Sequence, residues 1–350
     1  MDVDYIIVGL GLAGLAFIEE LQRNKKTFVV FENESQVSSK VAAGMFNPVV
    51  LKRFTPVWNG KEQLDIAIPF FENLESVFSK KYIHYIDIYR VFKSVEEQNN
   101  WFVACDKPLL SSYMSTKILV NNNKEVIAPF GFGKLQHTGK VALELLLNDY
   151  YKKLSDENKI IKKSFIHDDL IISNDGFTYN NIKAKKIIFS EGYGLKDNPF
   201  FNYLPMNEAK GELLTIHAPK LKIDYMLKAA VFVLPLGDDL YKVGATFNWK
   251  DKTSVPSEEG KTELINKLEM TIKTPYKIIT HIAGIRPTVK DRRPLIGIHP
   301  TYKNMAILNG LGTRGVMLAP TMSKFLYNYI ENNIPLEKEI DIKRYHSYLD

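Results

Sequence analysis

The feature that most restricts the fold lies near the start of the chain. An apolar stretch, YIIV at residues 5–8, leads into the glycine-rich sequence GLGLAG, about eleven residues with a helical pattern, and a second apolar stretch at residues 27–31. Strand, glycine turn, helix and strand in this order predict a βαβ unit with parallel strands. Such a unit cannot stand alone, so we expect an α/β domain built on it.

The glycines of this turn and the acid that follows the second strand predict a dinucleotide site. Gly9, Gly11 and Gly14 fill the pattern G-x-G-x-x-G, in which the first forms a tight turn, the second admits a pyrophosphate and the third lets helix and strand pack closely. The helix N-terminus offers free N–H groups to the phosphates. Glu32 is placed to accept the hydroxyls of an adenosine ribose, which disfavours NADP. The motif alone does not distinguish NAD from FAD.

Composition narrows the class of protein further. The chain has 350 residues, of which 45% are hydrophobic and 25% charged, enough for one large domain or two smaller ones. No uncharged stretch reaches the roughly 18 residues that span a membrane, and the acidic start MDVD precedes only a short apolar run. We therefore expect a soluble, cytoplasmic protein without a signal peptide.

The net charge, the single cysteine and the spacing of the histidines argue against other classes of protein. The net charge of +6 is mild and the lysines are scattered, which indicates solvated surfaces, although a basic patch for RNA assembled in three dimensions stays open. The single cysteine, Cys105, excludes an internal disulfide framework and is expected to be a buried thiol. The seven histidines lack metal-ligand spacing, so we predict no metal site.

A second glycine cluster, NGLGTRGVMLAP, lies at residues 309–320. It ends a segment that contains G-x-R-P, then D-x-x-P-x-I-G, an apolar strand and a glycine turn opening a helix. Together with AAGM at residues 42–45, this pattern resembles the D-amino-acid oxidase-like FAD oxidoreductases over nearly the whole chain, most densely at its two ends. The resemblance implies FAD, and implies that the second cluster brings backbone N–H groups to the flavin. No histidine lies in the loop where some relatives attach flavin, so noncovalent FAD is expected.

Two kinds of family member are similar in different segments. AAGM is most like glycine oxidase, whereas LGTRGVMLAP followed by NNIPLEKEIDIKRYH is like the FAD domain of the bifunctional enzyme that removes a carboxymethyl group from a modified tRNA wobble uridine. The chain departs from the family at Glu191 and Tyr193, where a small residue and G-x-W are usual. It also has Phe232 near a position where glycine oxidase-like proteins have a tyrosine, which argues against glycine itself as the substrate.

The resemblance implies an α/β fold with a Rossmann-type, glutathione-reductase-like FAD-binding domain interleaved with an antiparallel-sheet α+β substrate domain. Because cofactor motifs lie at both ends of the chain, we predict a discontinuous FAD-binding domain of residues 1–80, 131–200 and 281–350. The substrate domain is predicted to contain residues 81–130 and 201–280.

The expected cofactor-binding residues belong to the two glycine clusters, the ribose acid, the AAGM segment and the strand and turn around residue 190. They are Gly9, Gly11, Leu12, Ala13, Gly14, Glu32, Asn33, Ala42, Ala43, Gly44, Met45, Ile166, Ser190, Gly192, Gly310, Leu311, Gly312, Thr313, Gly315 and Val316.

Arginine usage points to a carboxylate anchor. The chain has 8 arginines against 38 lysines, yet four of the 8 lie between residues 286 and 314. A planar guanidinium can bind a carboxylate through two hydrogen bonds, which lysine cannot copy. Arg286, in the apolar sequence AGIRP, is the predicted anchor, and Arg314 is a second catalytic candidate. Arg292 and Arg293 are interpreted as solvated turn residues, and Lys210 as a surface lysine.

The predicted reaction is oxidation of the C–N bond of a small carboxylate-bearing amine or amino acid. Hydride transfer to flavin N5 would give an imine, and O2 or another acceptor would reoxidise the flavin. One alternative is a 2-hydroxy-acid dehydrogenase of the same fold that uses a quinone or carrier. Another is demodification of a carboxymethylaminomethyl group on a tRNA wobble uridine, and a third is a flavin-bearing scaffold without catalysis.

Overall fold

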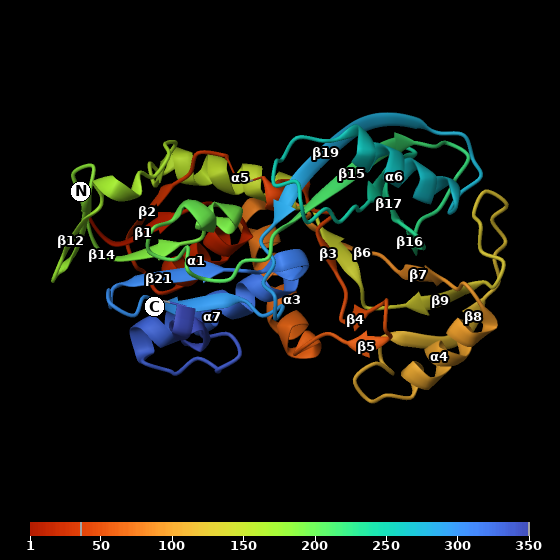
Figure 1. Ribbon diagram of the computed structural model, residues 1–350, viewed down its shortest axis with the longest axis horizontal. Coiled ribbons are helices and arrows are strands. Elements are labelled where there is room, and N and C mark those ends of the chain that lie inside the picture. The colour runs from red at the N-terminus through yellow and green to blue at the C-terminus, as the bar shows by residue number, and fades with distance from the viewer. Residues whose placement is uncertain (36, 349–350) are drawn as a thin grey trace.

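The computed structural model describes residues 1–35 and 37–348, and its two large β-sheets lie toward opposite ends of an elongated molecule (Figure 1). The first sheet has the order β11-β2-β1-β14-β13-β12, with β21 paired to β14 and β20 paired to β21. Its strands are β1 (Asp2–Val8), β2 (Phe28–Phe31), β11 (Ile160–Ile161), β12 (Ile171–Ser173), β13 (Gly176–Tyr179), β14 (Ile182–Phe189), β20 (Leu295–Ile298) and β21 (Met305–Asn309).

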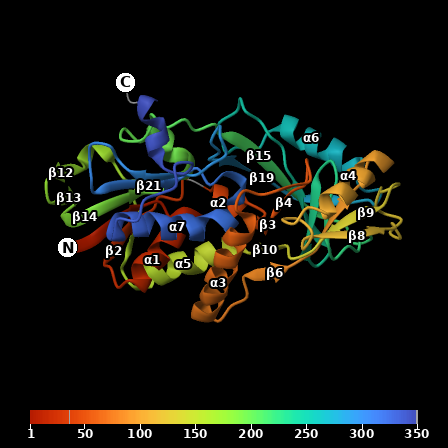
Figure 2. The same ribbon diagram turned by 90° about the horizontal axis from the view of Figure 1, so that it is seen from below.

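The centre of the first sheet is the predicted βαβ unit. Strand β1 pairs in parallel with β2 and with β14, and β14 pairs in parallel with β21. Helices α1 (Leu12–Arg23), α5 (Leu143–Asp156) and α7 (Gly315–Asn332) lie along one face of this sheet, with α3 (Gly60–Phe78) beside them (Figure 2). Tyr5 and Ile7 pack in the core on the helical face, whereas Ile6 and Val8 belong to the core on the other face. Burial on both faces explains the continuous apolar runs of these strands.

The second sheet is largely antiparallel, with the order β19-β15-β18-β17-β16-β7-β9-β8. Its strands are β7 (Ile88–Val91), β8 (Met114–Leu119), β9 (Phe132–Leu135), β15 (Ala209–His217), β16 (Met226–Lys228), β17 (Phe232–Gly237), β18 (Leu240–Gly244) and β19 (Lys277–Arg286). Helix α6 (Glu258–Glu269) packs on one face of this sheet through Leu264 and Leu268. Helix α4 (Val95–Cys105) packs through Trp101 on the core that contains Ile88 and Met114.

Short elements connect the two sheets. They are α2 (Ser38–Val41), β3 (Met45–Phe46), β4 (Val49–Val50), β5 (Thr55–Pro56), β6 (Ile83–Tyr85) and β10 (Gly139–Val141). The stretch at residues 38–48, which includes the AAGM segment, therefore contains a helical turn and a short strand. Strand β11 is short, and beyond it Phe165 and His167 line the cavity described below.

The sheets place two chain segments differently from the predicted domain boundaries. Strand β9, which the prediction assigned to the FAD-binding domain from residue 131, pairs with β7 and β8 in the second sheet. Strand β19 stays paired with β15 as far as Arg286, beyond the predicted boundary at residue 281. The division into two domains itself stays a prediction. Within the described residues no helix is both long and apolar enough to cross a membrane.

The expectation of a buried thiol at Cys105 is confirmed. The side chain is 3% exposed in the core beneath α4, and burial raises the pKa of the thiol to about 11. A thiol protonated at neutral pH is a poor nucleophile, so Cys105 is a packing residue.

Candidate active site

A cavity of about 640 Å³ is lined by residues of both large sheets, and a cavity of this size can hold a large organic ligand. Of the predicted cofactor-binding residues, all line it except Gly14, Ile166 and Gly310. Of the two predicted catalytic arginines, Arg286 lines the cavity, whereas Arg314 is not among the lining residues. Most of the predicted residues are therefore brought together, although their roles in binding remain predictions.

The first glycine turn forms one end of the cavity. Gly9 has φ +97°, and a Cβ there would lie 2.6 Å from the carbonyl oxygen of Ser190. A Cβ on Gly14 would lie 2.1 Å from the carbonyl oxygen of Gly9, so this residue permits packing and does not itself contact a ligand. Gly11 precedes α1 without a side-chain cap, and the N–H of Leu12 donates to Ser39 Oγ at 3.2 Å. The turn thus presents a helix N-terminus to the cavity.

Glu32 is held at the end of β2 by backbone donors. Its carboxylate accepts hydrogen bonds from the N–H groups of Leu10 and Glu34, and the residue lines the cavity. This position agrees with the predicted contact to a ribose, since a carboxylate next to the glycine turn can accept hydroxyl protons.

The second glycine cluster reaches the same cavity from the far end of the chain. Gly310 and Gly312 have φ +71° and +58°, which makes the sharp turn between β21 and α7 possible. Gly310 itself faces Val289 and Leu295, while Gly312 and Gly315 line the cavity. Helix α7 begins at Gly315 without a side-chain cap, so a second helix N-terminus with free N–H groups meets the cavity. Two such termini favour an anionic ligand.

Ser190 supplies a further sign of a missing polar ligand. It is 5% exposed, it lines the cavity, and its Oγ has no hydrogen-bond partner among the described residues. Buried hydroxyls are nearly always paired, so this atom is free for a ligand of the cavity.

Ile166 and Arg314 are two predicted site residues that do not line the cavity. Ile166 is 48% exposed and its N–H donates to the hydroxyl of Tyr179 at 2.9 Å, whereas its neighbours Phe165 and His167 line the cavity. Arg314 lies in the turn before α7, where burial and the nearby Arg292 and Arg293 lower the pKa of its guanidinium. No motif in the sequence marks Phe165 or His167 as cavity residues.

Arg286 is positioned on the wall formed by the second sheet. It is half-buried at the end of β19, its Nη1 donates to the carbonyl oxygen of Lys210 at 3.3 Å, and its Cζ lies 4.1 Å from the ring centroid of Phe247. A Cβ on Gly211 would lie 1.9 Å from Nη2, so that glycine makes room for the guanidinium. Burial lowers the pKa of Arg286 to about 10, and no described carboxylate forms an ion pair with it. The cation is therefore free to bind a ligand carboxylate.

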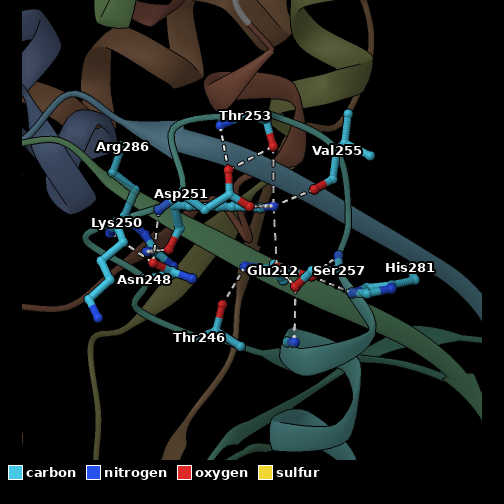
Figure 3. A network of polar contacts seen from close by, with 12 residues as sticks. Glu212, Thr246, Asn248, Lys250, Asp251, Thr253, Val255, Ser257, His281 and Arg286 are labelled. Atoms are coloured by element: carbon cyan, nitrogen blue, oxygen red, sulfur yellow. Dashed lines mark hydrogen bonds and ion pairs between the residues drawn. The ribbon is translucent and has the colours of Figure 1, made fainter.

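The prediction of a surface position for Lys210 is wrong. Its side chain is 0% exposed, and its Nζ lies 2.5 Å from Asp251 Oδ2 and 3.5 Å from Glu212 Oε1 (Figure 3). The ammonium also donates to the carbonyl of Val255. A β-strand turns alternate residues to opposite faces, and the segment at residues 248–257 covers the face that Lys210 occupies. The network thus fixes this segment to β15, next to Arg286.

Glu212 completes the network. Its carboxylate accepts hydrogen bonds from the N–H and hydroxyl of Ser257 at 2.9 and 2.7 Å, and it lies 2.7 Å from Nε2 of His281. A Cβ on Gly260 would lie 2.4 Å from this carboxylate, so the start of α6 closes over it. Glu212 is 1% exposed, and the surrounding donors compensate its burial.

Part of the chain matches a known protein family. Residues 160–328 match the family described as FAD dependent oxidoreductase (DAO). The glycine oxidase of Bacillus subtilis is 27% identical over 146 residues, which cover 40% of this chain and 40% of the relative. The tRNA 5-methylaminomethyl-2-thiouridine biosynthesis bifunctional protein of Legionella pneumophila is 23% identical over 189 residues, covering 45% of this chain and 28% of the relative. The matched parts thus span less than half the length of these relatives.

Comparison with solved structures supports the α/β fold. The crystal structure of glycine oxidase from Geobacillus kaustophilus superposes with a TM-score of 0.79 at 16% identity and covers 98% of each chain. The α/β fold predicted from the sequence is confirmed. The family model matches residues 160–328, just under half of the chain, and this match supports a relation to the FAD-dependent oxidoreductases. The predicted resemblance to this family is confirmed over these residues, and the name of the family supports FAD as the cofactor.

The residues present fit this cofactor. The uncapped N-termini of α1 and α7 can meet the pyrophosphate and the flavin, Glu32 can meet the ribose, and the unpaired Ser190 Oγ can donate or accept one further hydrogen bond.

Proposed function

We propose that this enzyme oxidises the C–N bond of a small amine or amino acid that bears a carboxylate, with FAD bound noncovalently. The substrate would lose its Cα–H hydrogen as a hydride and one N–H proton to solvent, while the nitrogen lone pair forms the C=N bond of an imine. Bound FAD would accept the hydride and pass its two electrons to O2, giving hydrogen peroxide. The names of the glycine oxidase relatives support an amino-acid substrate.

The observation that carries the proposal is the free guanidinium of Arg286. It lies on the cavity wall formed by the second sheet, and the glycine turns lie on the part built from the first sheet. A carboxylate bound there would place the rest of a small substrate between the two walls. Phe247 and the carbonyl of Lys210 hold the guanidinium in one orientation, which favours a two-point contact over a diffuse charge.

The remaining wall would keep water away from the reacting carbon. Leu213, Met226 and Phe232 line the cavity on the side of the second sheet. An apolar wall strengthens the interaction between the guanidinium and a carboxylate because it lowers the local dielectric constant. No described carboxylate pairs with Arg286 in place of the substrate.

The test is anaerobic reduction of the holoenzyme by a panel of primary and secondary amines with and without a carboxylate. We expect flavin bleaching only with carboxylate-bearing amines. Arg286→Lys keeps the charge but removes the planar fork, so kcat/KM should fall at least about tenfold, equivalent to about 1.4 kcal/mol. Arg53→Lys, an exposed arginine outside the cavity lining, serves as the control.

Two results would redirect the proposal. If Arg286→Lys leaves kcat/KM unchanged while Arg314→Lys abolishes it, the anchor is the other arginine. If 2-hydroxy acids bleach the flavin and amines do not, the protein is a hydroxy-acid dehydrogenase. Hydrogen peroxide formed in air distinguishes O2 from a quinone or carrier as the acceptor.

A further inference from the structure

The cavity wall formed by the second sheet has an unbalanced charge. Among the described residues that line the cavity from this sheet, only two are charged, Arg286 on β19 and Lys228 on β16, and both are positive. The acidic residues that line the cavity, Glu32, Glu191 and Asp197, all come from the first sheet and the turns that follow its strands. The proposed function uses Arg286 and leaves Lys228 without a role.

Lys228 has no internal partner that explains its position. It is half-buried, it shares the cavity-facing side of β16 with Met226, and its ammonium forms no hydrogen bond or ion pair with any residue in the described parts of the chain. Its nearest aromatic contact is the ring of Phe232, 5.9 Å from Nζ. An ammonium removed from water without a carboxylate is unfavourable, so such a residue is usually retained for a ligand.

The neighbouring strand makes the position still more positive. Arg90 on β7 lies directly opposite Lys228 in the parallel register and is 8% exposed. Its Nη2 forms an ion pair with Glu97 Oε1 at 2.5 Å, and its Nε is buried without a partner. Burial first, and then the charge of Arg90, lower the pKa of Lys228 to about 8. Lys228 is therefore still cationic at neutral pH in a site that favours an incoming anion.

We propose that Lys228 binds a second anionic group of the substrate, so that the enzyme acts on an amine with one carboxylate for Arg286 and a second anion at its other end. The identity of the reaction rests on the proposed function above, whereas the two-anion binding site does not. The pyrophosphate of FAD is not the expected partner, because the glycine turn that would hold it lies on the part of the cavity built from the first sheet.

The order of the strands gives the approximate distance between the strands that carry Arg286 and Lys228. Strands β16 and β19 are separated by β17, β18 and β15, which corresponds to roughly 19 Å at about 4.8 Å per strand. The second anion should therefore sit several bonds from the amine, and a series of ligands of increasing length would locate it.

The binding test uses the holoenzyme and isothermal titration calorimetry. Straight-chain α,ω-dicarboxylates of increasing length are compared with monocarboxylates of the same length. We expect at least one length at which the dicarboxylate binds about tenfold or more tightly than its monocarboxylate. Lys228→Met should abolish that preference and Lys228→Arg should keep it, with Lys228→Gln measured alongside in case the methionine variant folds poorly.

Lys242 offers a matched control. It lies on β18 of the same sheet, is half-buried, and burial lowers the pKa of its ammonium, yet it does not line the cavity. Lys242→Met should therefore leave the dicarboxylate preference unchanged. A preference that survives Lys228→Met and Lys228→Gln, or that is absent at every length, overturns the proposal.

A turnover test separates this inference from the proposed reaction. N-alkylglycines that end in a carboxylate are compared with those that end in a methyl group. The kcat/KM for the carboxylate-ended substrate, divided by that for the methyl-ended one, should fall about tenfold in Lys228→Met. If dicarboxylates bind as expected but no amine bleaches the flavin, the second anion site stands and the proposed reaction falls. If the amines react with no preference for a second carboxylate, the reaction stands and the site falls.

Discussion

The buried ammonium of Lys210 gives the sharpest test of how the second sheet is stabilised. Lys210→Met removes the charge and keeps most of the aliphatic volume. The carbonyl of residue 210, which accepts the hydrogen bond from Arg286, is unaffected by the change in side chain. The substitution therefore tests the ion network of Figure 3 while leaving this contact of the proposed carboxylate anchor in place.

The expected loss follows from the burial of the partners. Lys210 and Glu212 are 0% and 1% exposed, and Asp251 is 32% exposed. Removing one member of a buried pair typically destabilises a protein by about 3–5 kcal/mol, because the other charge stays buried without compensation. Glu212 keeps the donors of Ser257, and Asp251 can be hydrated, so we expect about 3 kcal/mol, the lower end of that range.

The assay is urea denaturation of the holoenzyme as a function of pH. The Lys210 ammonium is the largest cause that lowers the pKa of Asp251, from 3.8 to about 2. An acid with a lowered pKa in the folded state stabilises that state above pH 3.8, and this contribution is lost as the pH falls toward 2. The difference between wild type and Lys210→Met should therefore be largest at neutral pH and shrink below pH 4.

Two further variants make the result decisive. Lys61→Met removes an exposed ion pair with Asp65 and should change the free energy of unfolding far less than Lys210→Met does, because water screens the pair. The double variant Lys210→Met/Asp251→Asn should be less destabilised than the sum of its single changes by at least about 1 kcal/mol. A loss for Lys210→Met no larger than that for Lys61→Met, or one independent of pH, would refute the reasoning.

The remaining predictions concern Lys228 and the first glycine turn. Lys228→Met should stabilise the protein at pH 7 by at most about 3 kcal/mol, because burial lowers the pKa from 10.5 to about 8. Between pH 8 and 10.5 the unfolded state binds more protons than the folded state, so the wild type gains stability as the pH rises through this range. The advantage of the variant, measured by urea denaturation, should therefore vanish by about pH 10.5. Gly14→Ala should lower the melting temperature and the FAD content, because its Cβ would lie 2.1 Å from the carbonyl oxygen of Gly9. Gly11→Ala, whose Cβ would be 3.4 Å from Ser39 Oγ, should keep the fold and weaken only FAD binding.

The parts of the fold that depend on local signals could be predicted from the sequence. The βαβ unit, the turn between β21 and α7 and the position of Arg286 are each marked by glycine, proline or periodic apolar residues within a few positions. Pairing between distant segments carries no such signal. Strand β9 joins the second sheet through β7, more than forty positions earlier in the chain, and nothing in its four residues predicts that partner. The predicted boundary at residue 131 therefore separates β9 from the strands with which it pairs.

Lys210 and Lys228 show why a sequence identifies a lysine but not its role. Both belong to strands of the second sheet, and each stands beside apolar or glycine residues in the sequence. Lys210 finds Asp251 some forty positions later, so its charge is neutralised within the protein and contributes to stability. Lys228 finds another cation, Arg90, on the adjacent strand, and is left facing the cavity. Removing a buried charge that has a partner leaves the partner uncompensated and destabilises the fold, whereas removing one without a partner relieves an unfavourable burial. The expected signs of the two methionine substitutions, destabilising at Lys210 and stabilising at Lys228, follow from that difference alone.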